Sequence, residues 1–378
     1  MVQLRELIHA AQLERCGERE LPVLSMTMHD GIVLQSARFK KSLASFDQSA
    51  YKVVSRNQLV VGFPIDEGVL FIQKAIDVGI MSPAYDVWNV DQSRVDLDYL
   101  ELCLHSPQAM LFYKNNLRGT TARRRSLPKE TFLSFPLRLP DLSTQRKIVN
   151  IIIRVKQIIR LLHKKNQYFD NLIKARFVEM FGDLRRNPYG WKLESFANMT
   201  ELITDGEHAT PRRVEKGIYL LSARNILNHS LQLEDVDFID QEEYDRISKR
   251  IVPREGDVLI SCSGTIGRCC SVPAGIKFQM VRSAALLRFN TIILPRFAEY
   301  MVASDFLQEQ INQAKTASSQ ANLFQGKIAK LTGFVPPMEI QEQFVAFVSL
   351  LDKSKVVVQK ALDKAQQLFD SLMQEYFG

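Results

Sequence analysis

The sequence predicts an α+β protein in which two mixed α/β domains are each followed by one long helix. The first observation is a repeat at long range: the helical stretch ending Phe181-Gly182 recurs as the C-terminal Phe377-Gly378, 196 residues further on (181 to 377). The second is that both stretches begin at a proline, Pro140 and Pro336, with the same offset (140 to 336). A period of this size is too long for a solenoid, so it indicates tandem duplication of one domain-plus-helix unit.

A heptad pattern in both copies predicts that the two helices cover each other. The apolar seam positions are Ile148, Ile152, Val155, Ile159, Leu162, Phe169 and Ile173, and then Phe344, Val348, Leu351, Val358, Leu362, Phe369 and Leu372. Asn166, Arg176 and Lys355 interrupt the seam, a device that fixes register at some cost in stability. A helix of about forty residues is roughly 60 Å long, so its stripe needs a helix as cover. The alternative is two unrelated helices, each packed on its own domain.

Turn-rich stretches divide the chain into five segments. The expected segments are a first domain at 1–140, a long helix at 141–182, a linker at 183–190, a second domain at 191–335 and a second helix at 336–378. In the second domain, residues 256–267 are typical of a hairpin, because their glycines suit a tight turn between strands. A phosphate-binding loop is the weaker interpretation of Gly264 to Gly267, since no Lys-Ser/Thr follows.

Composition bounds the class of protein. The 378 residues are 46% hydrophobic and 24% charged, which is ordinary for a globular chain of two or three domains. No signal peptide and no uncharged apolar run of about 18 residues is present. The five cysteines show no metal-ligand spacing, so we expect no metal site and free thiols in a reducing cytoplasm. The net charge of +7 indicates an acidic partner only weakly.

Basic and amide-rich loops are the candidate nucleic-acid contacts. They contain Arg123, Arg124 and Arg125 in the first domain, and Arg212, Arg213, Arg224, Asn225, Ser318, Gln320 and Asn322 in the second. Lys and Arg supply charge for phosphates, while hydroxyls and amides supply short-range hydrogen bonds. Arg224 and Asn225 are the types best suited to bidentate guanine and adenine contacts. A solvated surface would look similar, and His208 near Asp205 is typical of a polar loop rather than of a metal site.

Several motifs, taken in order, resemble the specificity subunit of type I restriction-modification systems over essentially the whole chain. In the second half they lie at 219–226, 256–267, 318–323, 328–331 and 335–341, and in the first half at 54–60, 82–85 and 139–145. Each motif alone is weak, but the ordered set, present twice, is specific. The sequence departs from the family at Thr144 and Ile340, where a glutamate usually precedes the helix glutamine.

The resemblance implies two target recognition domains, each reading one half of a bipartite site in double-stranded DNA. It implies that the two helices pack as an antiparallel coiled coil with internal two-fold pseudo-symmetry and dock methyltransferase subunits, two because the framework is duplicated. Restriction and translocase subunits would complete a cytoplasmic prokaryotic complex for antiviral defence.

The resemblance also implies that this chain is not an enzyme and that S-adenosylmethionine belongs to the partner. The residues agree, because no GxxxxGK[ST] motif occurs and Pro336-Pro337 lacks the flanking residues of an adenine methyltransferase motif. A coiled-coil scaffolding protein that binds other proteins is the alternative, and a self-contained nuclease or methyltransferase is disfavoured.

Overall fold

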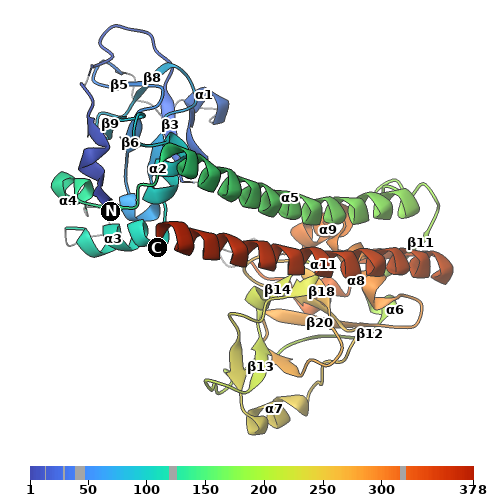
Figure 1. The fold of residues 1–378 in the computed structure, drawn as a ribbon. Coiled ribbons are helices and arrows are strands. Elements are labelled where there is room, and N and C mark those ends of the chain that lie inside the picture. Colours follow the sequence, from blue (N-terminus) through green and yellow to red (C-terminus); the bar gives the residue numbers. More distant parts are fainter. Residues whose placement is uncertain (13, 29, 39–46, 119–125, 316–320) are drawn as a thin grey trace. The chain divides into compact units, whose positions relative to one another are not determined.

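The computed structural model describes the chain except for residues 13, 29, 39–46, 119–125 and 316–320. It separates into two compact units: unit 1 holds residues 1–164 and 358–378, and unit 2 holds residues 165–357. The long helices are α5 (Leu142–Phe181) and α11 (Met338–Phe377), each of 40 residues, and each contributes to both units (Figure 1). The predicted α+β class with two long helices is confirmed.

Unit 1 contains a mixed domain of short strands and helices. Its strands are β1 (Val2–Gln3), β2 (Ile8–Ala10), β3 (Leu24–Thr27), β4 (Gly31–Leu34), β5 (Lys52–Ser55), β6 (Leu59–Val61), β7 (Leu70–Ile72), β8 (Val78–Met81), β9 (Asp86–Val90) and β10 (Pro136–Leu137). Its helices are η1 (Leu4–Glu6), α1 (Gln35–Arg38), η2 (Ile65–Glu67), α2 (Leu97–Leu104), α3 (Pro107–Asn116) and α4 (Lys129–Leu133). The four-stranded sheet has the order β2-β9-β6-β7, and β1 pairs with β10.

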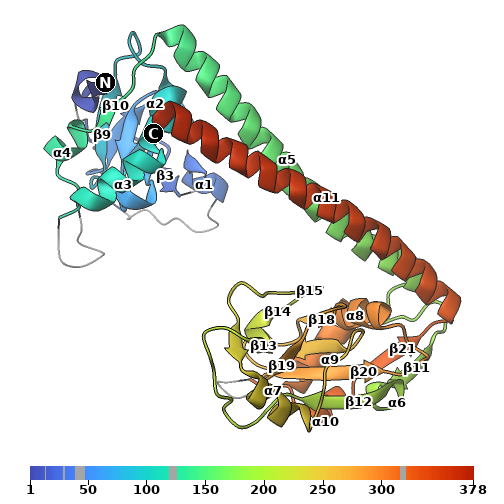
Figure 2. The ribbon, with the colours of Figure 1, turned by 60° about the horizontal axis from the view of Figure 1, so that its bottom comes forward.

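Unit 2 contains the second mixed domain. Its strands are β11 (Lys192–Ser195), β12 (Thr200–Asp205), β13 (Ile218–Leu221), β14 (Ile226–Leu227), β15 (Ser230–Leu231), β16 (Asp237–Ile239), β17 (Val258–Ser261), β18 (Cys269–Ser271), β19 (Phe278–Met280), β20 (Ala284–Phe289) and β21 (Thr332–Val335). Its helices are α6 (Phe196–Met199), η4 (Ala223–Asn225), α7 (Gln241–Ser248), α8 (Pro295–Ala303), α9 (Asp305–Ala314) and α10 (Gln325–Ile328). Figure 2 shows α8 beside β18, and α8 also contacts β20 and α9.

The two domains repeat one plan. The unit 2 sheet has the order β12-β20-β17-β18, which matches β2-β9-β6-β7 position by position. In both domains the first strand pairs antiparallel with the last, as β1 with β10 and β11 with β21. The β6–β7 hairpin of unit 1 therefore occupies the place of the β17–β18 hairpin, although its sequence lacks the glycine and serine signal that marks the second copy.

The helices pack antiparallel within each unit. In unit 1, Ile148 and Ile152 near the start of α5 share a core with Met373 and Phe377 at the end of α11. In unit 2 the roles are exchanged, because Ile173, Phe177 and Phe181 at the end of α5 pack with Phe344, Val348 and Leu351 of α11. The antiparallel pairing that the family resemblance implies is therefore present, and the two halves of the chain use it reciprocally.

The predicted seam faces inward along both helices. Ile148, Ile152, Val155, Ile173, Phe344, Val348, Leu351 and Val358 are buried, and Ile159, Leu162, Phe169, Leu362, Phe369 and Leu372 are half-buried. Of the polar interruptions, Lys355 reaches across to Asp170 with Nζ 2.6 Å from Oδ1, and the guanidinium of Arg176 lies 5.8 Å from the Phe347 ring centroid. The Oδ1 atom of Asn166 is buried without a partner among the described residues.

The apolar stripe widens at the helix ends beyond what the heptad pattern predicts. Phe177 and Phe181 lie beside the seam and are buried, whereas the seam positions Arg176 and Met180 are half-buried. The reason is that the domain covers the helix end: the Phe181 ring packs on Phe297 of α8 with 4.9 Å between centroids. Such aromatic contacts contribute about 0.5–1.5 kcal/mol per pair beyond area burial.

A buried glutamine ties each long helix to its own domain. Gln145 Oε1 accepts from the Asp96 backbone N–H (2.8 Å), and its Nε2 donates to the Arg94 and Pro140 carbonyls (3.0 and 2.8 Å). Gln341 repeats these bonds. Its Oε1 accepts from Leu294 N–H (2.9 Å), and its Nε2 donates to the carbonyls of Ile292 (3.0 Å) and Pro336 (2.9 Å). Asp96 and Leu294 are the N-caps of α2 and α8, so each glutamine clasps the start of a domain helix.

Replacing a clasp glutamine tests this joint. Gln341→Ala removes three hydrogen bonds and leaves a buried N–H and two carbonyls without their partner, so we expect the free energy of unfolding to fall by at least about 1–3 kcal/mol. Denaturant unfolding monitored by circular dichroism measures it. Gln343→Ala, two residues away on the exposed face of α11, is the matched control. Equal stability of the two variants would contradict a role for the clasp.

Candidate nucleic-acid interface

Arg212 and Arg213 lie in the loop between β12 and β13, and both pair with carboxylates. Arg212 Nη2 is 2.5 Å from Asp240 Oδ2 and 3.0 Å from Glu242 Oε2, at the N-terminus of α7. Arg213 Nε is 2.8 Å from Asp237 Oδ2. The two side chains stay 61% and 46% exposed, and exposed pairs of this kind contribute only about 0–1 kcal/mol. A phosphate can therefore compete for these arginines at small cost.

Arg224 is exposed in the short helix η4 and shares an acidic partner with Arg213. Its Nη2 lies 2.9 Å from Asp237 Oδ1 and 3.9 Å from Asp235 Oδ1. The hydrogen bond from Arg213 and the charge of Arg224 lower the pKa of Asp237 against the opposing effect of burial. The Asp237 carboxylate thus holds Arg213 and Arg224, two of the predicted DNA contacts, close together on one surface of unit 2.

The structure assigns Asn225 a role different from the predicted base contact. Its side chain is fully buried. Oδ1 accepts from the backbone N–H and the hydroxyl of Ser222, at 2.9 and 3.0 Å, and Nδ2 donates to the carbonyls of Gln232 and Asp235. Both ends of the amide are occupied, so no group is left for a base edge in this conformation. Asn225 instead shapes the loop that presents Arg224.

Other predicted contacts lie in segments outside the described residues. These are Arg123, Arg124 and Arg125 in unit 1, and Ser318 and Gln320 in unit 2. Asn322 is described and half-buried, and it forms an antiparallel bridge with Ser263 of the β17–β18 hairpin. Asn322 and the predicted glycine hairpin are therefore neighbours in unit 2.

A depression next to Arg224 brings η4 and the β17–β18 hairpin together. It is lined by Ser222, Ala223, Arg224, Ser263, Gly264, Thr265, Arg268 and Ser283. Arg268 lies just before β18 and was not among the predicted contacts, because the hairpin motif predicted only a turn. The basic residue next to a glycine- and serine-rich turn was the signal that could have pointed to it.

Buried serine bonds hold the hairpin loop. The Ser261 hydroxyl, fully buried, donates to the Thr265 carbonyl (2.6 Å) and accepts from the Arg268 N–H (3.0 Å). Gly264 has φ +65°, and a Cβ there would meet nothing within 4 Å. Glycine is therefore required by backbone conformation rather than by space.

The acidic residue near His208 belongs to a polar network. Asp205 Oδ2 lies 2.9 Å from His208 Nε2, and Asp205 Oδ1 accepts from Arg250 (2.7 Å) and from the amide of Gln325 (2.5 Å). Across the described residues no group of three or more His, Cys, Asp or Glu side chains is placed to hold a metal ion. The polar-loop interpretation of His208 agrees with this geometry.

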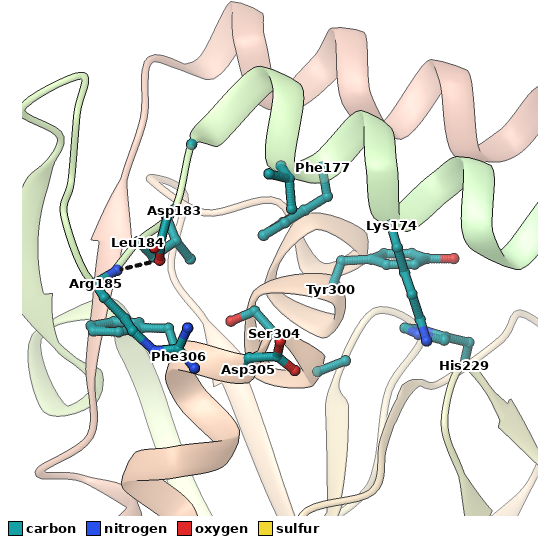
Figure 3. Close-up of a pocket in the computed structure, with 13 residues that line it drawn as sticks. Lys174, Phe177, Asp183, Leu184, Arg185, His229, Tyr300, Ser304, Asp305 and Phe306 are labelled. Atoms are coloured by element: carbon teal, nitrogen blue, oxygen red, sulfur yellow. Dashed lines mark hydrogen bonds between the residues drawn. The ribbon is translucent and has the colours of Figure 1, made fainter.

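A second hollow, of about 510 Å³, lies where the end of α5 meets α8 and α9. Figure 3 shows Asp183 and Arg185 on one side of it and Tyr300, Lys174 and His229 on the other. Arg185 pairs with Glu309 of α9, and the His229 ring stacks on Tyr300 with 4.1 Å between centroids. Because Arg185 and His229 already have protein partners, we interpret the hollow as a joint between helix and domain.

Beneath that hollow lies a buried ion network. Glu299 is fully buried; it lies 2.6 Å from His229 Nδ1 and accepts from the backbone and hydroxyl of Ser271 and from Arg296. Arg296 continues to Asp352 of α11 with 2.7 Å between Nη2 and Oδ2. Burial alone would raise the pKa of Glu299, but the bond to His229 and the charge of Arg296 outweigh it and leave that pKa below its ordinary value.

The five cysteines are buried free thiols. Burial raises the pKa of Cys262 and Cys270 to about 12, so neither carries the thiolate that a nucleophile needs at neutral pH. Among the helices that the structure describes, none combines the length and the apolar character required to cross a membrane.

Comparison with known proteins bears on this arrangement. The family model for the type I restriction modification DNA specificity domain matches residues 212–365. A comparison with curated protein sequences gives no match. A chain from a structure on complex assembly and conformational transition of the type I R-M system is 16% identical, with 100% of this chain and 96% of that chain covered and a TM-score of 0.57. The S subunit of a type I restriction-modification system from M. genitalium is 12% identical, with 100% and 95% covered and a TM-score of 0.55.

The repeated sheet order and the reciprocal helix pairing define a protein of two duplicated domains whose long helices pair antiparallel in each unit. Residues 212–365 match the family model of the type I restriction modification DNA specificity domain, and the fold over the whole chain is similar to that of the type I specificity subunits. The resemblance carried by the ordered motifs is confirmed.

The buried network predicts a pH dependence of stability. Because the pKa of Glu299 is below its ordinary value of 4.5 in the folded state, its contribution is fully present above pH 4.5 and is lost as the pH falls through the lower folded value. We expect Glu299→Gln to cost about 3–5 kcal/mol at pH 7, since it breaks a buried ion pair.

Denaturant titrations at pH 7 and at stepwise lower pH measure this effect. The difference in stability between parent and Glu299→Gln is expected to shrink below pH 4.5. Glu342→Gln, an exposed glutamate of α11, is the control and keeps the parent profile. A difference in the free energy of unfolding between parent and Glu299→Gln that stays constant down to pH 3 would contradict the stabilising role of the Glu299 carboxylate.

Proposed function

We propose that this chain is the non-catalytic specificity subunit of a type I restriction-modification complex, in which each domain reads one half of a bipartite DNA target. The single observation that carries the proposal is the repetition of the four-stranded sheet order together with the glutamine clasp. Two domains with one framework but different loops suit two different half-sites. The residue segments 1–140 and 191–335 are proposed as the two target recognition domains.

The helices are proposed to set the distance between the half-sites. Helices 141–182 and 336–378, with the linker 183–190, connect the domains covalently, and their continuous seam supports one fixed register. A fixed register gives a fixed number of unspecified base pairs between the two recognised elements, which a flexible linker would not give.

DNA contacts are proposed for the exposed arginines. Arg212 and Arg213 suit phosphates, because each can exchange a weak surface carboxylate for a phosphate oxygen. Arg224 is the candidate for a base contact, since bidentate arginine suits guanine. Arg123 to Arg125, Ser318, Gln320 and Asn322 remain proposed contacts on sequence grounds.

The proposed partners are double-stranded DNA, two methyltransferase subunits and, in the full complex, restriction and translocase subunits in a prokaryotic cytoplasm. S-adenosylmethionine is proposed to bind the methyltransferase subunits and not this chain. Exposed apolar side chains on the helices support docking: Leu161 is 64% exposed and Val357 is 67% exposed, at equivalent positions of the repeat (161 to 357). Ile158, three residues before Leu161, and Leu350, seven residues before Val357, are exposed as well (50% and 64%), and neighbouring exposed apolar side chains, unlike single ones, are typical of an interaction surface.

Changing helix length tests the spacing role. Inserting four residues into both helices adds about one turn and roughly 6 Å, which corresponds to roughly two base pairs. We expect the methylated motif, determined by methylome sequencing, to gain unspecified bases while both half-sites keep their sequence. A two-residue insertion turns the seam away from its partner and is the control that should abolish methylation. An unchanged spacing in the four-residue variant rules the role out.

Charges on the exposed apolar positions test docking. We expect Leu161→Glu and Val357→Glu each to weaken binding of one methyltransferase subunit by about tenfold or more, because a carboxylate would be buried in an apolar contact. Analytical ultracentrifugation with purified methyltransferase measures the stoichiometry. His163→Glu and Gln359→Glu add the same charge two residues further along each helix, where both side chains are exposed. Two subunits bound to the Leu161, Val357 double variant would contradict this docking surface.

A further inference from the structure

The depression between η4 and the β17–β18 hairpin is lined by cationic and hydroxyl side chains, most of which have no role in the function proposed above. Eight residues line it, and none of them is acidic. Two are arginines, and four carry hydroxyl groups: Ser222, Ser263, Thr265 and Ser283. A concave surface with cationic and hydroxyl donors but no carboxylate suits an anion that only accepts hydrogen bonds.

Arg268 differs from Arg212, Arg213 and Arg224 in its partners. Arg212, Arg213 and Arg224 all pair with carboxylates of the same surface. Within the part of the chain that the structure describes, Arg268 forms no ion pair, and its half-buried side chain faces the depression. Its backbone N–H donates to the Ser261 hydroxyl at 3.0 Å, so the base of the side chain is held in place, and the guanidinium has no hydrogen-bond partner among the described residues.

One hydroxyl is oriented as a donor by the protein itself. The Ser283 oxygen accepts a hydrogen bond from the Ala223 N–H at 3.0 Å. Because that bond uses an oxygen lone pair, the Ser283 proton remains available to an acceptor in the depression. Ser263 and Thr265 stand on the loop whose left-handed Gly264 turns the chain, and successive N–H groups in such turns commonly form anion-binding concavities.

We propose that Arg268, with the hydroxyls of Ser263, Thr265 and Ser283, holds one backbone phosphate of the DNA that unit 2 binds. The proposal rests on the proposed function and adds to it a specific positioning contact. Arg268 fixes the strand next to Arg224, and Arg224 is then the side chain that reaches a base. Contacts to phosphate fix register and carry no sequence information of their own.

The phosphate role makes a distinctive prediction for Arg268→Ala. Binding to every duplex should weaken by the same factor, and the slope of log binding constant against log salt concentration should fall by about one. Arg268→Lys keeps the charge and should retain the slope with weaker binding, because the forked donor geometry is lost. Arg254→Ala is the matched control, since Arg254 is exposed at the opposite end of β17 from the hairpin.

The experiment uses the full chain assembled with its methyltransferase subunits. Fluorescence anisotropy with a labelled random-sequence duplex and with the methylated target, over a series of KCl concentrations, gives affinity and slope. Uniform weakening by Arg268→Ala with a slope reduced by about one supports the proposal. Behaviour equal to Arg254→Ala overturns it, and so does an unchanged slope with relaxed preference at one base. Thr265→Glu, at an exposed loop position, gives the same test by charge repulsion if Arg268→Ala does not fold.

Different results contradict the proposed DNA-binding function and the proposed phosphate site. If the parent complex itself shows no salt-dependent DNA binding, the proposed function is wrong whatever Arg268 does. If the parent binds and only the Arg268 and Thr265 variants leave binding unchanged, the specificity role stands and the phosphate site is wrong.

Discussion

The buried side chains of Gln145 and Gln341 are the constraint on which the arrangement of each unit depends. A fully buried amide must satisfy one acceptor and two donors, and in both copies it does so with a backbone N–H at the start of a domain helix and two nearby carbonyls. Two of the partners belong to the domain, at the start of α2 or α8, and the third is the carbonyl of the proline just before the long helix. The direction in which the long helix leaves its domain is therefore fixed by hydrogen bonds, which tolerate only a narrow range of angles. Apolar packing alone would leave that direction free to slide, because it is not directional. The clasp recurs after 196 residues (145 to 341) together with the same strand order, as expected for tandem duplication of the whole unit.

Packing along the helices is uneven, and the unevenness follows from what covers them. At the end of α5, Phe177 and Phe181 join Phe297 and Phe344 in one aromatic cluster, because both the partner helix and the domain cover that turn. Away from the domains only the partner helix is available, so burial narrows to the seam, and Asn166 and the Lys355–Asp170 pair appear there. Polar seam residues cost stability but restrict register. The most extensive apolar contacts therefore lie where a long helix joins its domain. The polar contacts that restrict register lie where the two helices contact only each other.

The fold was largely predictable from sequence because its main signals are local and repeated. The continuous heptad pattern predicts both long helices. The equivalent residues Pro140 and Pro336, with Gln145 and Gln341, indicate where each helix begins. Phe177 and Phe181 were missed because a heptad pattern describes contact with one helix and says nothing of a domain that covers a second face. Asn225 was predicted to contact a base because an asparagine side chain suits adenine. In the structure its amide N–H groups donate instead to the carbonyls of Gln232 and Asp235, seven and ten residues further on, and the sequence gives no local sign of these bonds. The acidic partners of Arg212 and Arg213 come from the segment at Asp237 to Glu242, and no local pattern reveals such a pairing.

Pairing most of the exposed arginines with carboxylates has a physical consequence for recognition. An arginine held by Asp237 or Asp240 contributes to DNA binding only the difference between a phosphate and a carboxylate partner, so its contribution to binding any random duplex is reduced. Because the exposed pairs are weak, the exchange remains possible when a well-placed strand offers a better geometry. If the proposed phosphate contact holds, Arg268, which has no ion pair among the described residues, would bind a phosphate without such an exchange. The paired arginines would add to the binding free energy only where the fit of the strand allows them to change partners, so Asp237 and Asp240 would weaken binding to random duplexes more than binding to a well-fitting strand.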